Sequence, residues 1–290
     1  MLKEYLSQKK ELIEKELQKN LRKYSHPKTL SEALYYAVMN GGKRLRPILM
    51  YMMCDLFQRS YDNIKDIASA LEFIHCYSLV HDDLPAMDDD MYRRGKPTVH
   101  IKYDEATAIL VGDILLTEAF NIIATSEYIN DKNKVSVISK LSEYAGFYGM
   151  AGGQFVDIKS EHVKVSYDTL RYIHENKTGK LITAAIELPL IVLNVNEIRK
   201  EKLIEYSRLI GTAFQIKDDI LDIEGTFEKI GKQPSDEKLE KTTYPSLFGL
   251  EKSKEMLNEY ILKAKKILEQ DFESNTLLME LTDYLGKREV

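Results

Sequence analysis

The sequence predicts an all-α fold, and three observations support that prediction. Only 14 Gly and 7 Pro interrupt the 290 residues, which leaves long segments that suit helices. Apolar residues in these segments recur at steps of three and four, the spacing of one helix face. The sequence lacks sustained alternation of apolar and polar residues, the pattern of a half-buried strand. It also lacks a linker, a repeat or a low-complexity tract, so we expect one domain over residues 1–290.

The first predicted helices follow from local signals near the N-terminus. Residues 2–21 place leucines and isoleucines at helical spacing among Lys, Glu and Gln, which predicts an amphipathic helix. Thr29 and Glu32 have the spacing of a capping box, which predicts that the second helix begins there. The glycine pair at 41–42 should end it, because glycine readily adopts the conformation that follows a helix.

The later helices are predicted in the same way. Pro47 suits the first turn of a third helix, and residues 64–84 form a long apolar helix that Pro85 should end. Residues 85–102 and 224–243 are rich in Asp, Lys, Arg, Gly and Pro, and we expect them to be loops that carry function. Further helices are predicted over 104–125, 132–151, 168–188, 197–223, 244–269 and 275–285.

Composition excludes several classes of protein. The 41 Lys and Arg against 46 Asp and Glu give a net charge of −5, which argues against a nucleic-acid binder, and 44% apolar residues argue against disorder. Cys54 and Cys76, without a Cys/His cluster, exclude a disulfide scaffold and a zinc site and are expected to be buried thiols. No uncharged apolar stretch approaches the length of a membrane span, and the N-terminus has no apolar signal core, so we expect a cytoplasmic protein.

Two acidic clusters stand out against this background. Residues 81–90 read HDDLPAMDDD, and residues 218–222 read DDILD, where Asp218 and Asp222 are four residues apart and share a helix face. Carboxylates this dense repel one another unless cations neutralise them, and oxygen ligands without His or Cys suit Mg²⁺. Either cluster alone has the alternative interpretation of a solvated charged helix end. Neither has the alternating ligands, central Gly and closing Glu of an EF-hand.

Basic residues lie beside both clusters and elsewhere near glycines. Residues 41–47 read GGKRLRP, residues 93–96 read RRGK, residues 177–180 read KTGK, and Lys232 and Lys241 flank the second loop. Each group alone is compatible with an ordinary surface. Taken with the acidic clusters they predict that Mg²⁺ holds a diphosphate whose other oxygens are bound by Arg and Lys. The sequence therefore indicates diphosphate chemistry.

These motifs, in this order, resemble the trans-isoprenyl diphosphate synthase family over nearly the whole chain. The segments that carry the resemblance are GGKRLRP at 41–47, DDLPAMDDD at 82–90, RRG at 93–95, GGQ at 152–154, KTG at 177–179 and FQIKDDILD at 214–222. The spacing of the first acidic motif is similar to the longer form in bacterial members that make farnesyl diphosphate.

The resemblance implies a fold, a reaction and partners. The fold is a single large helical bundle around a deep central cavity, the isoprenoid synthase fold, with the two acidic motifs facing each other. The reaction is head-to-tail condensation of isopentenyl diphosphate with dimethylallyl or geranyl diphosphate, with three Mg²⁺ per active site once diphosphate is bound. A proton leaves to the departing diphosphate, so no protein nucleophile is required. The expected assembly is a homodimer.

The resemblance also implies roles for individual residues. The implied metal ligands are Asp82, Asp83, Asp88, Asp218 and Asp222. The implied ligands of isopentenyl diphosphate are Lys43, Arg46, His75 and Arg94. The implied allylic-site residues are Arg93, Lys177, Thr178, Gln215 and Lys232. Of these, Lys177, Thr178 and Gln215 are the implied catalytic residues, and Thr178 and Gln215 would face the allylic cation.

Two departures affect these assignments. On a straight helix Asp82 and Asp88 would point about 120° apart, and Asp89 would align better with Asp82. The role of Asp88 therefore requires Pro85 or a bulge to loosen the turn. The loop that holds Lys232 is one residue shorter than the family pattern, which leaves its role open.

Product length depends on the helix that leads into the first motif. Tyr77 lies five residues before Asp82, about one helical turn, where a bulky residue acts as a floor in the family. This favours farnesyl diphosphate, with a core aromatic as the alternative interpretation of Tyr77. A geranylgeranyl diphosphate synthase, a terpene cyclase and a non-catalytic partner subunit are the competing functions. Both intact acidic motifs and the block at 41–47 disfavour the last two.

Overall fold

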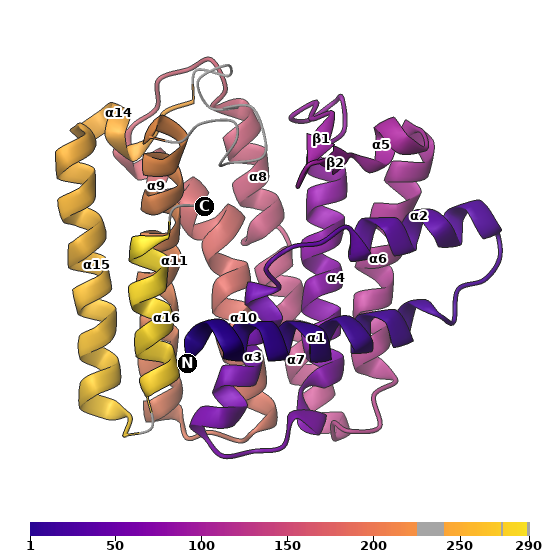
Figure 1. Ribbon diagram of the computed structural model, residues 1–290, viewed down its shortest axis with the longest axis horizontal. Helices are drawn as coiled ribbons and strands as arrows, with labels where there is room; N and C mark the ends of the chain where they lie inside the picture. The colour runs from indigo at the N-terminus through magenta and orange to yellow at the C-terminus, as the bar shows by residue number, and fades with distance from the viewer. Residues whose placement is uncertain (225–240, 274, 289–290) are drawn as a thin grey trace. The chain divides into compact units, whose positions relative to one another are not determined.

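The computed structural model describes residues 1–224, 241–273 and 275–288, and helices dominate this part of the chain (Figure 1). This confirms the predicted all-α class. The chain divides into two compact units, Lys3–Ser139 with Ile191–Leu193 and Lys140–Leu190 with Asn194–Val290, while Met1 groups with the first and Leu2 with the second. The single domain over 1–290 stays a prediction.

The first unit contains most of the N-terminal half of the chain. Its elements are α1 (Leu2–Leu21), α2 (Lys28–Met39), α3 (Leu45–Leu56), the 3₁₀ turn η1 (Tyr61–Asn63), α4 (Lys65–Asp82), β1 (Tyr92–Arg93), β2 (Lys96–Pro97), α5 (Val99–Lys102), α6 (Glu105–Ala124) and the start of α7 (Asp131–Ala145). Helix α4 is apolar on nearly all sides and packs against α2, α3 and α6, so it forms the centre of this unit.

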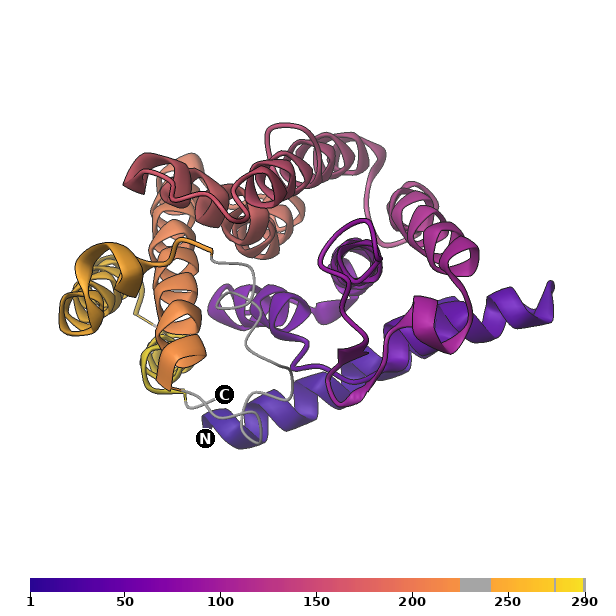
Figure 2. The ribbon, with the colours of Figure 1, turned by 90° about the horizontal axis from the view of Figure 1, so that it is seen from above.

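The second unit contains the rest of the described chain. Its elements are the end of α7, then α8 (Met150–Lys159), α9 (Tyr167–Ile173), the π-helical η2 (His174–Gly179), α10 (Lys180–Val192), α11 (Glu197–Glu224), α14 (Tyr244–Phe248), α15 (Leu250–Asp271) and α16 (Thr276–Lys287). Helix α11 is the longest of them, and Figures 1 and 2 show α15 and α16 beside it. Ala213, Ile216 and Ile220 of α11 belong to a hydrophobic core that packs this helix against α14 and α15.

Helix α6 is the one helix in the described chain that is long and apolar enough, by length and composition, to cross a membrane. It lies along α4, and its buried residues include Ala108, Val111 and Leu115. A side chain on Gly112 would collide with the His81 imidazole, so this glycine allows the two helices to approach. We therefore interpret α6 as a core helix.

Several predicted boundaries hold and others are wrong. The helix over 2–21 matches α1, and α4 ends at Asp82, close to the predicted break at Pro85. The capping box is wrong, because α2 begins at Lys28 after Pro27, without a side-chain cap. The helix over 132–151 was predicted too long, because α7 ends at Ala145 and α8 begins only at Met150.

A short hairpin lies inside the first predicted loop. Strands β1 and β2 pair Tyr92 with Pro97 and Arg93 with Lys96. The two turn residues, Arg94 (φ 55°) and Gly95 (φ 74°), both have positive φ, as a type I′ hairpin turn requires. Apolar and polar residues do not alternate long enough here to predict the hairpin from the sequence, since each strand has only two residues.

Candidate active site

The basic loop between α2 and α3 packs around a side chain from the hairpin. Gly41 (φ 93°) and Gly42 (φ 117°) adopt backbone conformations that favour glycine. The Arg94 guanidinium donates a hydrogen bond to the Gly41 carbonyl. A Cβ on Gly42 would lie 2.5 Å from Nη1 of Arg94, so the glycine pair makes room for this cation.

The same loop leads to a contact between two of the predicted diphosphate ligands. Arg46, in the first turn of α3, lies 3.2 Å from Nε2 of His75 on α4. Burial and the nearby Arg46 and Arg94 lower the pKa of His75 well below its usual value, so its ring is neutral near pH 7 and accepts from Arg46. Lys43 is exposed on the loop. The first unit thus gathers cations that suit an anion with several oxygens.

The first acidic motif is a tight turn after α4, not an extension of it. The Asp88 amide donates to the Asp82 carbonyl at 2.9 Å, and the Met87 and Asp89 amides both donate to the Leu84 carbonyl. This turn brings the Asp88 backbone against Asp82, so the 120° separation on a straight helix does not arise. Asp82 and Asp88 are half-buried, whereas Asp89 is exposed with φ 51°.

The second aspartate of this motif is held by an arginine. Asp83 is 3% exposed, and its Oδ1 lies 2.5 Å from Nε of Arg93, which also lies 3.4 Å from Asp90. Burial raises the pKa of Asp83 to about 7, although Arg93 opposes the shift. The Asp83–Arg93 pair joins the end of α4 to β1 and so fixes the turn. Metal binding by Asp83 stays a prediction.

The second acidic motif lies on α11, where its aspartates divide in a similar way. Asp218 and Asp222 are half-buried at i and i+4, as predicted. Asp219 is 6% exposed and accepts a hydrogen bond from the Tyr244 amide at 2.8 Å, and its Oδ1 lies 3.8 Å from Nε2 of His174. Asp219 therefore ties α11 to α14 and η2.

The partners of Asp218 include Gln215 and Arg288. Gln215, a predicted allylic-site residue one turn earlier, donates to it at 3.2 Å. Arg288, near the C-terminus, donates to Asp218 Oδ1 at 2.5 Å and to the Phe214 carbonyl at 2.9 Å. The Arg288 guanidinium also lies 3.9 Å from the centre of the Phe214 ring. Sequence reasoning missed Arg288, because nothing in its local pattern points to a residue 70 positions away.

Lys177 lies on the π-helical turn η2, and a buried carboxylate holds it. Its Nζ is 2.7 Å from Oδ2 of Asp157 on α8, and Lys241 reaches the same oxygen at 3.1 Å. Burial alone would raise the pKa of Asp157, but the two lysines outweigh it and lower the pKa. Asp157 follows the GGQ motif by three residues, which was the available signal for it.

The GGQ and KTG motifs meet where Gly153 approaches the backbone of Lys177. A Cβ on Gly153 would collide with the Lys177 backbone nitrogen, so α8 approaches η2 only with glycine there. Gly179 packs against Gly211 of α11, where an added Cβ would lie 3.4 Å away. Thr178, which follows Lys177 in the KTG motif, is half-buried. Lys232 and its loop lie outside the described residues.

Tyr77 is buried in the first unit, one turn before the motif. It is 8% exposed, and its ring packs edge-on against His81 with the centroids 5.8 Å apart. His81 Nε2 in turn lies 3.0 Å from the Ile109 carbonyl of α6. Burial raises the pKa of Tyr77 to about 12. The role of Tyr77 as the floor that limits the length of the product stays a prediction.

The donor sets fit Mg²⁺. Asp82 and Asp88 in the first unit, and Asp218 and Asp222 in the second, offer hard carboxylate oxygens. In the described part of the chain, no three His, Cys, Asp or Glu side chains form a metal site by themselves. Mg²⁺ is commonly held by one or two protein carboxylates together with substrate phosphates. These carboxylates would therefore bind Mg²⁺ together with the oxygens of a phosphate ligand.

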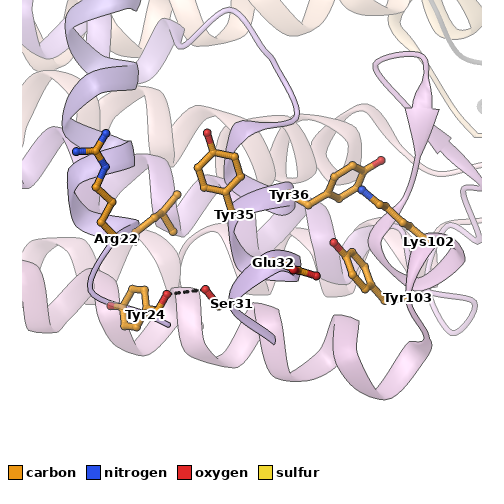
Figure 3. Close-up of a pocket in the computed structure, with 9 residues that line it drawn as sticks. Arg22, Tyr24, Ser31, Glu32, Tyr35, Tyr36, Lys102 and Tyr103 are labelled. Carbon is orange, nitrogen blue, oxygen red and sulfur yellow. Dashed lines mark hydrogen bonds between the residues drawn. The ribbon is translucent and has the colours of Figure 1, made fainter. Parts of the chain in front are cut away.

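A separate hollow of about 640 Å³ lies on the first unit (Figure 3). It is lined by Leu21, Arg22, Tyr24, Ser31, Glu32, Tyr35, Tyr36, Lys102 and Tyr103. The Lys102 ammonium lies 3.5 Å from the centre of the Tyr36 ring, and Tyr36 donates to the Pro97 carbonyl. None of the predicted site residues lines this hollow.

Comparisons with known proteins agree with these features. Residues 27–285 match the polyprenyl synthetase family model. The farnesyl diphosphate synthase of Micrococcus luteus is 44% identical over 291 residues, 99% of each chain, and the geranylgeranyl diphosphate synthase of Cyanophora paradoxa is 39% identical over 98% of this chain and 95% of its own. The crystal structure of a geranyltransferase from Legionella pneumophila superposes with a TM-score of 0.89 at 36% identity, over 99% of this chain and 98% of that one.

Proposed function

Because the chain belongs to the polyprenyl synthetase family, we propose that it condenses isopentenyl diphosphate with dimethylallyl and then geranyl diphosphate to make farnesyl diphosphate. The observation that carries this proposal is that the cations Arg46 and Arg94 gather with the neutral His75 ring at the basic loop. An elongating enzyme needs such a site for a second diphosphate, besides the carboxylates that serve the first. A terpene cyclase has only one diphosphate to bind.

The candidate site residues have distinct tasks in this reaction. Lys43, Arg46, His75 and Arg94 bind the diphosphate of isopentenyl diphosphate and orient its double bond. The neutral His75 ring contributes a hydrogen bond without adding charge. Arg93, Lys177, Thr178, Gln215 and Lys232 serve the allylic substrate, where lysines and arginines stabilise the leaving diphosphate and polar oxygens stabilise the allylic cation.

Asp82, Asp88, Asp218 and Asp222 are the proposed Mg²⁺ ligands, with three ions per active site, while metal binding by Asp83, which Arg93 holds, stays a prediction. When bound, Mg²⁺ withdraws charge from the leaving diphosphate and so promotes ionisation. The double bond of isopentenyl diphosphate then attacks the allylic carbon, and a proton passes to the departing diphosphate. The reaction requires no protein nucleophile.

We propose that the protein is a soluble, cytoplasmic homodimer. Ile109 and Leu110 on α6 are 45% and 52% exposed, which supplies apolar surface for a second copy. Analytical ultracentrifugation tests the assembly. The pair Ile109→Lys and Leu110→Lys should dissociate a dimer that uses this surface.

The purified protein with Mg²⁺, labelled isopentenyl diphosphate and each allylic primer tests the reaction. Chromatography of the products should show farnesyl diphosphate from dimethylallyl or geranyl diphosphate. Cyclic hydrocarbon formed without isopentenyl diphosphate would indicate a cyclase. A chain that is inactive alone but alters another synthase would indicate a partner subunit.

A longer product is the nearest alternative, and Tyr77 separates the two outcomes. Its buried ring one turn before Asp82 favours farnesyl diphosphate. We expect Tyr77→Ala to shift the main product to geranylgeranyl diphosphate or longer, with condensation intact, because the wall is removed. Tyr77→Phe keeps the ring and should keep the product. A Tyr77→Ala enzyme that still stops at farnesyl diphosphate would remove the main support for this product.

A further inference from the structure

We propose that Arg44, through its buried ion pair with Glu72, is a positioning residue for the isopentenyl diphosphate site. It holds the basic loop, taken here as residues 40–46 with the start of α3 included, so that Arg46 meets His75. This inference rests on the proposed function, because it names a determinant of one substrate's binding. Arg44 lies in the same GGKRLRP segment as Lys43 and Arg46, yet its surroundings differ from theirs.

Arg44 is too deeply buried to bind substrate itself. The residue is 2% exposed, and its side chain is fully enclosed, whereas Lys43 is exposed and Arg46 half-buried. A guanidinium removed from water loses its solvation unless carboxylates and carbonyls replace the water. A retained buried charge therefore requires specific partners.

Those partners come from three different helices. Nη1 donates to Glu72 Oε1 of α4 at 2.7 Å, and Nη2 donates to the Val38 carbonyl in the last turn of α2 at 2.6 Å. Nε lies 3.6 Å from Glu14 Oε1 of α1. Because the guanidinium is planar and rigid, these contacts fix its position and therefore the position of the loop.

The backbone at Arg44 needs this support. Arg44 has φ 52° and ψ 33°, a left-handed conformation that is unfavourable for a residue with a side chain. Such conformations persist where surrounding contacts over-determine them. The residue is also the N-cap of α3, so its conformation sets the direction in which α3 begins. Arg46 lies two residues later, in the first turn.

The Arg44–Glu72 ion pair and the Arg46–His75 contact both join the basic loop to α4. Glu72 and His75 are three residues apart on α4 and so are neighbours on the helix surface. Arg44 pairs with Glu72, and Arg46 lies 3.2 Å from His75. Two anchors one turn apart on α4 thus hold two residues of the loop in register. Loss of the first anchor should leave the second contact poorly aligned.

Arg44→Lys and Glu72→Gln test the proposal in the intact enzyme. Lysine keeps the charge but cannot reach both Glu72 and the Val38 carbonyl, and glutamine keeps the shape of Glu72 but removes its charge. We expect each to raise the KM for isopentenyl diphosphate about tenfold or more, while the KM for the allylic substrate changes less than about threefold. Each should also lessen the further effect of Arg46→Ala, since coupled residues are not additive.

Arg22→Lys, at an exposed arginine of α1's end, is the matched control and should change neither KM. Equal rises in both KM values, or a lowered melting temperature with the KM for isopentenyl diphosphate unchanged within twofold, would make the pair purely structural and overturn the proposal. If Arg44→Lys does not fold, Glu72→Gln decides. A wild-type enzyme that does not use isopentenyl diphosphate would refute the proposed function, whereas normal wild-type activity with unaffected variants refutes this inference alone.

Discussion

The two acidic motifs share a pair of adjacent aspartates but present them by different routes. In the first, α4 ends at Asp82, and a turn returns Asp88 to it through the 2.9 Å backbone hydrogen bond. In the second, α11 continues to Glu224, and the 3.6-residue period places Asp218 and Asp222 on one face. The spacing within a motif therefore does not predict its geometry until the end of the helix is known.

In both motifs the second aspartate of the pair is an anchor. Asp83 is enclosed with Arg93, and Asp219 is enclosed against the Tyr244 amide. Adjacent residues on a helix point about 100° apart, so when one faces the site its neighbour faces the packed interior. The comparison teaches that the first aspartate of each pair is half-buried, whereas the second is buried and held by a neighbouring element.

The largest effect is expected at the first aspartate of each pair. Asp82→Ala and Asp218→Ala should each lower turnover by about 10²–10³ or more, the usual loss when charge stabilisation at a leaving group is removed. Asp131→Ala, whose side chain is 98% exposed, is the control and should have normal rates. Steady-state kinetics with saturating Mg²⁺ measures the effect. Near-normal turnover in either variant would contradict the paired-motif mechanism.

The anchors should behave differently from the ligands. Asp83→Asn leaves the Arg93 charge poorly compensated and should lower the free energy of unfolding by about 2 kcal/mol, while Asp219→Asn can still accept from Tyr244 and should lose about 1 kcal/mol. Denaturant unfolding measures both. We expect turnover to fall far less than in Asp82→Ala. An Asp83→Asn protein of native stability without turnover would instead make Asp83 a metal ligand.

Asp83 and Asp157 show how neighbouring charges set the pKa of a buried carboxylate. Burial, with the nearby Asp82 and Asp90, raises the pKa of Asp83 in spite of Arg93, whereas Lys177 and Lys241 outweigh burial and lower the pKa of Asp157. A lowered folded-state pKa contributes stability above the unfolded value, near 3.9, and loses it as the pH falls through that range. Asp157→Asn should therefore be less stable than wild type by about 1–2 kcal/mol at pH 7.

The pH dependence provides the check on Asp157. The difference in the free energy of unfolding between wild type and Asp157→Asn should shrink as the pH falls below about 4. Asp168→Asn, on an exposed carboxylate of α9 (side chain 84% exposed), is the control and should show a small difference at every pH. A difference independent of pH would mean that Asp157 contributes through packing and not through its charge.

Much of the site was predictable because it depends on local patterns. Helical spacing gave α4 and α11, and the acidic motifs at their ends marked Asp82 and Asp218. Periodicity also contained a signal for Asp219, which follows the buried Ile216 by three residues. The roles of Arg44, Asp157 and Arg288 were not predictable, since each depends on partners from other elements, 20 to 70 residues away.

The smallest expected effect concerns the arginines, where the two motifs differ. Arg93 binds the anchor Asp83, whereas Arg288 binds Asp218, a predicted Mg²⁺ ligand. A guanidinium and Mg²⁺ compete for the same carboxylate oxygen, so removal of Arg288 should make Asp218 more available. We expect Arg288→Ala to lower the Mg²⁺ concentration for half-maximal activity about two- to fivefold, provided that the variant stays folded. Arg288→Lys keeps the charge, so its half-maximal Mg²⁺ concentration should lie closer to that of wild type.

Isothermal titration calorimetry with Mg²⁺, in the presence of inorganic diphosphate, measures the Mg²⁺ affinity without turnover. A weaker Mg²⁺ response in a folded Arg288→Ala protein would mean that Arg288 orients Asp218 for the metal, and the arginines of the two motifs would then have the same role.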